Sequence, residues 1–183
     1  MRYRQLVLAH GAAPALPAAW PADAVWRIND LAAYRRLRQA LGDAPRRLAV
    51  IGAGLVGCEL ANDLALAGHA ITLIDQQPLP LAALLPPAAS HQLLQAWAGL
   101  PIHFIGQAQV KSLSRGRVQL ADGTLLEVDE VIAATGLRTP GRLARSAGLA
   151  FDEAAGGIVV DAATGCSSQP LIHALGDCVV VQG

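Results

Sequence analysis

Residues 46–75 limit the possible folds of this chain more than any other segment. Their sequence is RRLAVIGAGLVGCELANDLALAGHAITLID. An unbroken apolar stretch at residues 48–51 is typical of a strand buried on both faces, and it ends at glycines spaced as G-x-G-x-x-G. Apolar residues then recur at helical spacing (Val56, Leu60, Leu64) up to Gly68, and a second apolar stretch, residues 70–74, runs into an acid. This order of strand, turn, helix, strand and acid predicts a dinucleotide-binding unit.

Each glycine of the fingerprint has a separate expected task. Gly52 allows a sharp turn out of the strand, Gly54 lets the backbone approach a pyrophosphate, and Gly57 allows tight packing of helix on strand. The phosphates are expected at the N-terminus of the helix, where Leu55 and Val56 contribute backbone N–H groups. Unpaired N–H groups and the positive end of the helix dipole bind an anion without a basic side chain.

Asp75 follows Gly57 by eighteen residues, where the fingerprint places an acid that accepts hydrogen bonds from the adenosine ribose. The alternative is that Asp75 only opens the turn at residues 75–78. Gln76 and Gln77 follow it, so no arginine is at hand for a 2′-phosphate. The pattern therefore predicts NADH rather than NADPH as the ligand.

Composition supports a well-buried α/β protein, because 53% of the 183 residues are hydrophobic and only 15% are charged. Fourteen basic and fourteen acidic residues cancel, which argues against a nucleic acid or an anionic membrane as partner. No apolar stretch approaches the roughly 20 residues of a membrane span, and the N-terminus lacks the layout of a signal peptide. A cytoplasmic location is expected by default.

Metal binding is not expected. The three cysteines, Cys58, Cys166 and Cys178, include no C-x-x-C pair. The five histidines are scattered without the spacing of metal ligands.

Periodicity predicts further elements on both sides of the central unit. Expected strands are at residues 4–9, 102–105, 130–134, 157–160 and 171–175, with an antiparallel meander over residues 107–128. Expected helices are at residues 88–98 and 142–147. An earlier helix should begin after Asn29 or Asp30 and end at Gly42, with Leu31, Tyr34, Leu37 and Leu41 as its buried stripe.

Four segments, LVLAHGAAP (6–14), GAGLVGCELAND (52–63), VIAATGLRTP (131–140) and IHALGDCV (172–179), occur in an order that resembles FAD-dependent pyridine nucleotide oxidoreductases. The likeness is to the rubredoxin reductase and ferredoxin reductase types. It implies a three-layer Rossmann-type α/β domain with a parallel sheet and a small antiparallel meander. That NAD-binding domain would comprise residues 25–145, flanked by partial FAD-domain segments at residues 1–24 and 146–183.

The resemblance also implies an oxidoreductase in which electrons pass from NADH through FAD to a rubredoxin or ferredoxin-type carrier. Glu59, the one predicted catalytic residue, would hold the nicotinamide carboxamide near the flavin, or would only complement the positive end of its helix. Thr135 and Gly136 would lie along the nicotinamide half, although Gly136 is equally a strand-to-loop glycine. Gly11 and Asp177 would contact FAD, with the alternative that Asp177 only forms a turn.

Three departures from the family pattern qualify these expectations. The family's own FAD fingerprint and C-terminal interface domain are missing, and His10 stands where threonine is usual. The isolated chain is therefore expected to be inactive and colourless, with FAD bound only in a longer protein. A free-standing, non-catalytic dinucleotide-binding or redox-sensing module is the alternative function.

Overall fold

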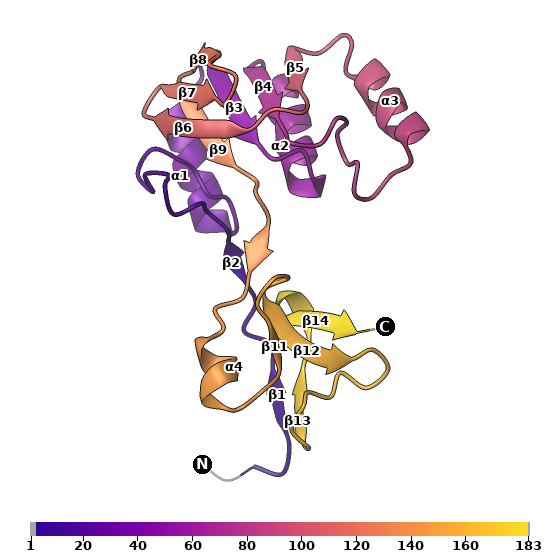
Figure 1. Ribbon diagram of the computed structural model, residues 1–183. Coiled ribbons are helices and arrows are strands. Elements are labelled where there is room, and N and C mark those ends of the chain that lie inside the picture. The colour runs from indigo at the N-terminus through magenta and orange to yellow at the C-terminus, as the bar shows by residue number, and fades with distance from the viewer. Residues whose placement is uncertain (1–2, 183) are drawn as a thin grey trace. The chain divides into compact units, whose positions relative to one another are not determined.

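The computed structural model describes residues 3–182 and divides the chain into two compact units (Figure 1). One unit is Leu16–Gly136, and the other combines Met1–Ala15 with Leu137–Gly183. The chain thus passes between these units at residues 15/16 and 136/137, and the predicted bounds of the NAD-binding domain, residues 25–145, stay a prediction. Leu16, Trp20 and Ala24 pack against a core of the first unit, whereas Ala144 belongs to the core of the second.

The unit Leu16–Gly136 is built on a four-stranded sheet of order β5-β4-β3-β9. Its strands are β3 (Arg47–Ile51), β4 (Ala70–Ile74), β5 (Ile102–Ile105) and β9 (Glu130–Ala133), and all neighbouring pairs are parallel. Val50 is in register with Leu73 on one side and with Ile132 on the other. The parallel sheet predicted from the apolar segments is confirmed.

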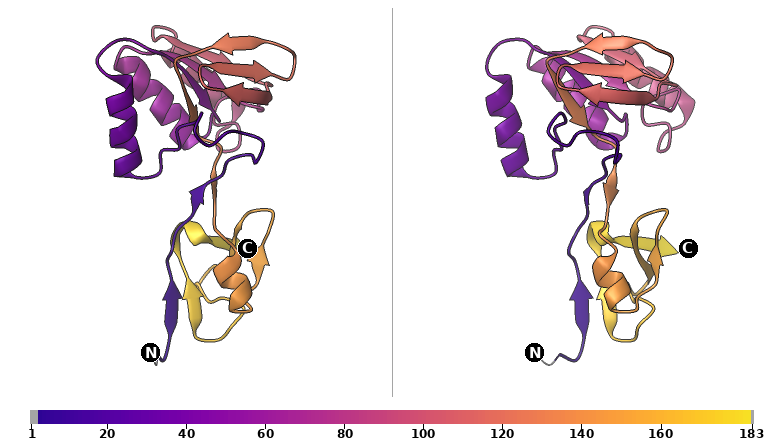
Figure 2. Two further views of the ribbon diagram at one scale, coloured as in Figure 1. Left: turned by 90° about the vertical axis from the view of Figure 1, so that its left-hand side faces the viewer. Right: turned by 60° about the vertical axis from the view of Figure 1, so that its left-hand side comes forward.

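Both faces of this sheet are covered, as Figure 2 shows. Leu48 and Val50 pack with helices α1 (Leu31–Leu41), α2 (Leu55–Leu66) and the end of α3 (Pro87–Ala96). Ala49 and Ile51 point the other way, into a core closed by a three-stranded antiparallel meander. Its strands are β6 (Val110–Ser114), β7 (Arg117–Leu120) and β8 (Leu125–Glu127). Burial on both faces explains the unbroken apolar sequence of β3.

The predicted buried stripe of α1 is wrong at two positions. Asp30 caps the helix by accepting a hydrogen bond from Ala33 N at 2.7 Å, as one of the two predicted caps. Leu37 and Leu41 are fully buried, but Leu31 is 61% and Tyr34 43% exposed. Ala33 takes the inner position instead, so the contact surface follows a narrower row of residues spaced by four. Helix α3 also ends at Ala96, two residues before the predicted end.

The second unit contains several short strand pairings around a small core. Strand β1 (Leu6–Leu8) is parallel to β13 (Ile172–Ala174), and β2 (Ala13–Pro14) is antiparallel to β10 (Leu137–Arg138). Strands β11 (Phe151–Asp152), β12 (Gly157–Asp161) and β14 (Val179–Gln182) form a three-stranded sheet. The short helices α4 (Arg142–Ser146) and η1 (Gly176–Cys178) complete the unit, whose core is Ala144, Leu149, Ile158, Val160, Ala174 and Cys178. Strands β2, β10, β11 and β14 were not predicted.

Within residues 3–182, no helix has the length and apolar character needed to cross a membrane.

A buried histidine ties the start of β3 to the turn between α2 and β4. His69 is 3% exposed, and its Nδ1 accepts a hydrogen bond from Arg46 N at 3.1 Å. That bond requires an unprotonated Nδ1. Burial, and then the positive charges of Arg38 and Arg46, hold the pKa of His69 below its ordinary value of 6.5.

We expect this histidine to make unfolding pH-dependent. Because the folded state depresses its pKa, the unfolded state takes up the proton first, and the stabilisation present above about pH 6.5 is lost as the pH falls below it. The free energy of unfolding should therefore drop more between about pH 7.5 and 5.5 in the wild type than in His69→Asn. Urea titrations at both pH values measure this. His91→Asn, on an exposed position of α3, should keep the wild-type pH dependence. Equal slopes for wild type and His69→Asn would contradict the assignment.

Candidate dinucleotide-binding site

The candidate site lies at the carboxyl edge of the parallel sheet, where β3, β4 and β9 end side by side. Gly52 follows β3 and donates its N–H to Ile74 O at 2.8 Å. Ala134 follows β9 and donates its N–H to Ile51 O at 2.8 Å. Ligands of open α/β sheets bind outside this edge. The residues of the predicted fingerprint are therefore brought together at the expected place.

Gly52 and Gly57 are required by the protein itself. Gly52 has φ +104°, and a β-carbon there would collide with the carbonyl oxygen of Ala134. A β-carbon on Gly57 would collide with the carbonyl oxygen of Gly52 and lie 3.3 Å from Cβ of Ala134. The turn and the helix thus pack backbone against backbone, which matches the tasks expected of these two glycines.

Gly54 differs from its two neighbours in the fingerprint. Its backbone has φ −76°, which any residue adopts, and a β-carbon there would meet nothing within 4 Å. Neither backbone conformation nor internal packing therefore requires glycine at this position. The space in front of Gly54 is open, as the approach of a pyrophosphate to the backbone would need.

Helix α2 begins at this open turn without a side-chain cap. Gly54 is the N-cap residue and makes no side-chain capping bond, and Leu55 and Val56 in the first turn are 59% and 52% exposed. The N–H groups of the first turn lack partners inside the helix, so they remain available to an anion. The exposure of Val56 corrects its predicted place in the apolar stripe of α2, which is formed by Cys58, Ala61, Leu64 and Ala65.

Asp75 is hydrogen-bonded to two backbone segments at the edge of the sheet. Its Oδ2 accepts from Ala53 N at 2.5 Å, and its Oδ1 accepts from Gln77 N at 2.7 Å. The second bond shows that Asp75 does open the turn that follows β4. Each carboxylate oxygen has a further lone pair, so the turn contact does not exclude a contact with ribose hydroxyls.

Cys58 lies beneath the glycine-rich turn as a buried thiol. Its Sγ donates to Ala53 O at 3.3 Å. Burial, and then the negative charge of Asp75, raise the pKa of Cys58 to about 11. Because the thiolate is the reactive form, this cysteine is a neutral, structural group near pH 7.

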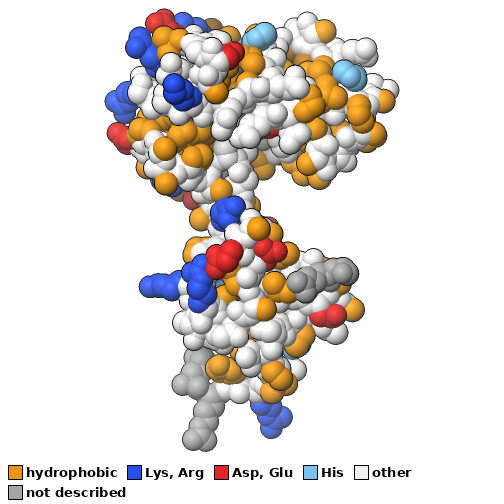
Figure 3. All heavy atoms as spheres, viewed as in Figure 1, with side chains coloured by type: hydrophobic (Ala, Val, Ile, Leu, Met, Phe, Trp, Pro, Cys, Tyr) orange, Lys and Arg blue, Asp and Glu red, His pale blue; other side chains and the backbone are white. Residues whose placement is uncertain are grey.

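The remaining predicted residues of this unit lie on exposed or partly exposed positions. Glu59 is exposed on α2, two residues beyond the fingerprint. Thr135 and Gly136 come just after Ala134, which follows β9, and the φ of Gly136, +90°, is itself a reason for glycine. Apolar side chains also reach the surface of this unit (Figure 3), among them Leu84, which is 59% exposed.

In the second unit, Thr139 links Gly11 and Asp177, the two residues predicted to contact the flavin, although no role was predicted for Thr139 itself. Thr139 is 5% exposed, and its Oγ1 lies 3.2 Å from Asp177 O and 3.5 Å from Gly11 O. One hydroxyl proton thus serves two carbonyl groups from distant segments. The side chain of Asp177 is exposed in η1, and His10 beside Gly11 is also exposed. A buried threonine cannot be distinguished from an exposed one by the pattern LRTP, which is why Thr139 was missed.

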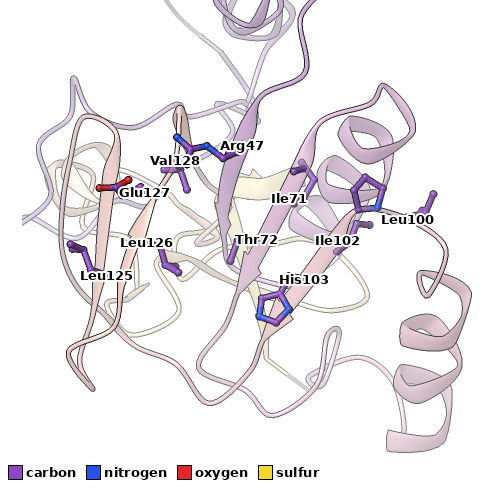
Figure 4. Close-up of a pocket in the computed structure, with 12 residues that line it drawn as sticks. Arg47, Ile71, Thr72, Leu100, Ile102, His103, Leu125, Leu126, Glu127 and Val128 are labelled. Carbon is purple, nitrogen blue, oxygen red and sulfur yellow. The ribbon is translucent and has the colours of Figure 1, made fainter.

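One hollow in this unit does not coincide with the candidate site. It measures about 740 Å³ and lies near the amino-terminal ends of β3, β4 and β5, beside β8 (Figure 4). Thr72 and His103 line it on the sheet, and Leu125 and Leu126 line it on the meander. It contains no fingerprint residue. Within residues 3–182, no group of three or more His, Cys, Asp or Glu side chains is arranged to hold a metal ion.

Comparison with known families agrees with this geometry. A family model described as pyridine nucleotide-disulphide oxidoreductase matches residues 1–183. The chain belongs to this family. The family indicated by the four sequence segments is thereby confirmed.

Individual relatives are similar over the whole chain. A protein named nitric oxide reductase FlRd-NAD(+) reductase from Klebsiella pneumoniae is 39% identical over 186 residues, covering 100% of this chain and 48% of that protein. Its counterpart in Salmonella gallinarum is 38% identical, with the same coverage. The chain therefore spans about half the length of the curated relatives it matches.

Solved structures confirm the predicted fold class. The putidaredoxin reductase of a covalent complex with putidaredoxin has a TM-score of 0.87 and 32% identity, over 99% of this chain and 45% of that one. A ferredoxin reductase from Rhodopseudomonas palustris has a TM-score of 0.88 and 28% identity, with the same coverage.

We expect Gly54→Val to abolish dinucleotide binding without unfolding the unit, because the added side chain would occupy the open space in front of the turn. Fluorescence titration with NADH measures binding, and thermal unfolding measures the fold. Gly99→Val is the matched control, since a β-carbon there also meets nothing within 4 Å. It should leave both properties near wild type. NADH binding by Gly54→Val within a few fold of wild type would mean that the turn is only structural.

Proposed function

We propose that the unit Leu16–Gly136 binds NADH, with the pyrophosphate at the start of α2 and the adenosine ribose at Asp75. The open position of Gly54 is the observation that carries this proposal, since nothing inside the protein accounts for glycine there. The uncapped N-terminus of α2 offers N–H donors to the phosphates. Asp75 lies one strand away, at the same edge of the sheet, with lone pairs left for ribose hydroxyls.

We further propose that the chain is part of an FAD-dependent reductase that passes electrons from NADH to a rubredoxin or ferredoxin-type carrier. When both are bound, NADH would supply a hydride, which is two electrons with a proton, and the flavin would release the proton and pass the two electrons on one at a time. The contribution of this chain is placement: Thr135 and Gly136 border the nicotinamide half, and Glu59 holds its carboxamide.

Family membership and the names of the relatives support the reductase proposal. The Klebsiella protein is named as an FlRd-NAD(+) reductase, and the putidaredoxin reductase was solved joined to putidaredoxin. Gly11 and Asp177 would supply part of the flavin site from the second unit, where Thr139 links their backbones. A cytoplasmic location is part of the proposal.

The proposed site should prefer NADH over NADPH. Asp75 would repel the 2′-phosphate of NADPH, and the following residues, Gln76 and Gln77, carry no compensating charge. We expect NADPH to bind about tenfold more weakly or worse, as measured by parallel fluorescence titrations of the purified chain. Equal affinity, or tighter binding of NADPH, would be incompatible with the proposed contact.

The reductase part of the proposal is tested in a protein that carries this chain together with a complete flavin-binding domain. Asp177→Ala should weaken FAD about tenfold or more, because a hydrogen bond to a charged group contributes roughly 1.5 to 3 kcal/mol. Asp177→Asn keeps a hydrogen-bond acceptor, so its FAD affinity should fall less than that of Asp177→Ala. Flavin absorbance after dialysis measures occupancy, and NADH-dependent reduction of a rubredoxin-type carrier should fall in parallel. Unchanged FAD retention in Asp177→Ala would remove Asp177 from the flavin site.

A further inference from the structure

We propose that Asp75 is also a positioning residue, which holds the glycine-rich turn in the conformation that receives a pyrophosphate. This inference rests on the proposed function and adds a second task to the acid at the ribose. It predicts that phosphate binding depends on Asp75 even for a ligand that contains no ribose.

The carboxylate of Asp75 faces two N–H donors from different segments. Oδ2 accepts from Ala53 N, inside the turn, and Oδ1 accepts from Gln77 N, beyond the strand. Hydrogen bonds to an ionised acceptor are the stronger class. Asparagine cannot reproduce the arrangement, because its amide has one acceptor atom and would place N–H donors against the other N–H group.

Ala53, between Gly52 and Gly54, is fixed on its carbonyl side as well. It is 2% exposed, and its oxygen accepts from Leu81 N at 2.8 Å and from Cys58 Sγ at 3.3 Å. Leu81 belongs to the segment after Asp75 and has φ +56°, a conformation that is unfavourable for leucine. The surrounding contacts must outweigh that strain. The peptide groups that precede Gly54 are thus held from two sides, and Asp75 is the only charged group among the contacts to Ala53 described in residues 3–182.

The two possible roles of Asp75 give opposite results for a simple phosphate ligand. If Asp75 only binds ribose, neutralising it removes a negative charge near the phosphate site, and an anion should bind equally well or more tightly. If Asp75 also holds Ala53, neutralising it frees the turn, and the N–H donors of the first turn of α2 no longer converge on the anion.

The test is a titration with inorganic pyrophosphate, followed through the backbone amide NMR signals of Gly54, Leu55 and Val56. The wild type is compared with Asp75→Asn and with Asp63→Asn. Asp63 is exposed further along α2, so its substitution removes the same charge without touching the turn. We expect pyrophosphate affinity to fall about tenfold or more in Asp75→Asn and to stay within about twofold in Asp63→Asn. Amide exchange at Ala53 should become faster in Asp75→Asn alone.

If Asp75→Asn does not fold, Asp75→Glu provides a second test of the positioning role. Asp75→Glu preserves the charge but displaces both carboxylate oxygens, so it should also lower the affinity for pyrophosphate. NADH is titrated into every variant in parallel. Loss of NADH affinity with unchanged or tighter pyrophosphate binding would overturn the positioning role and leave the NADH site standing. The positioning role would also be overturned if the wild-type chain bound NADH but pyrophosphate did not shift the amide signals of Gly54, Leu55 and Val56. A wild type that does not bind NADH would instead refute the proposed function.

Discussion

The rest of the site depends on one contact, in which the backbone at Gly52 packs against Gly57 of α2 and against Ala134 after β9. The carbonyl of Gly52 lies where a side chain on Gly57 would have to be, and the carbonyl of Ala134 lies where a side chain on Gly52 would have to be. Strand β3, helix α2 and the end of β9 therefore lie so close that no side chain fits between their backbones. This closeness fixes the direction in which α2 leaves the sheet, and with it the direction of the N–H groups in its first turn. Any side chain at either glycine would separate these elements and displace the N-terminus of α2, where we propose that the pyrophosphate binds.

Much of the unit Leu16–Gly136 could be predicted from sequence, because its signals are local. Continuous apolar stretches identified β3, β4 and β5, and the glycine spacing identified the turn and the start of α2. The failures concern the direction in which side chains point. Leu31 and Val56 lie in the first turns of their helices, where a residue with the right spacing still faces away from the sheet. Periodicity gives the angle between residues on a helix but not the angle of the helix to the core.

The second unit was harder to predict for a different reason. Its strands are short, and β2 and β10 pair through only two residues each, so neither has a pattern long enough to recognise. Its central link, from Thr139 to Gly11 and Asp177, joins positions separated by 128 and 38 residues. Likewise, the two interpretations of Asp75 that the sequence left open, ribose binding and turn formation, are compatible, because the bond from Gln77 N opens the turn and each carboxylate oxygen keeps a further lone pair. Such pairings are decided by the tertiary fold, and a single sequence carries no record of them.

The pairing of β2 with β10 has a consequence for the evolution of the chain. Leu137 is in register with Pro14, and Arg138 with Ala13, so the strand that leads into the unit Leu16–Gly136 and the strand that leads out of it lie side by side. A segment whose two ends are adjacent can be gained, lost or exchanged as a cassette, since the host chain can be rejoined across a short gap. The boundary at residues 15/16 and 136/137 thus marks a place where recombination could exchange the unit Leu16–Gly136 while the other unit keeps its own strand order.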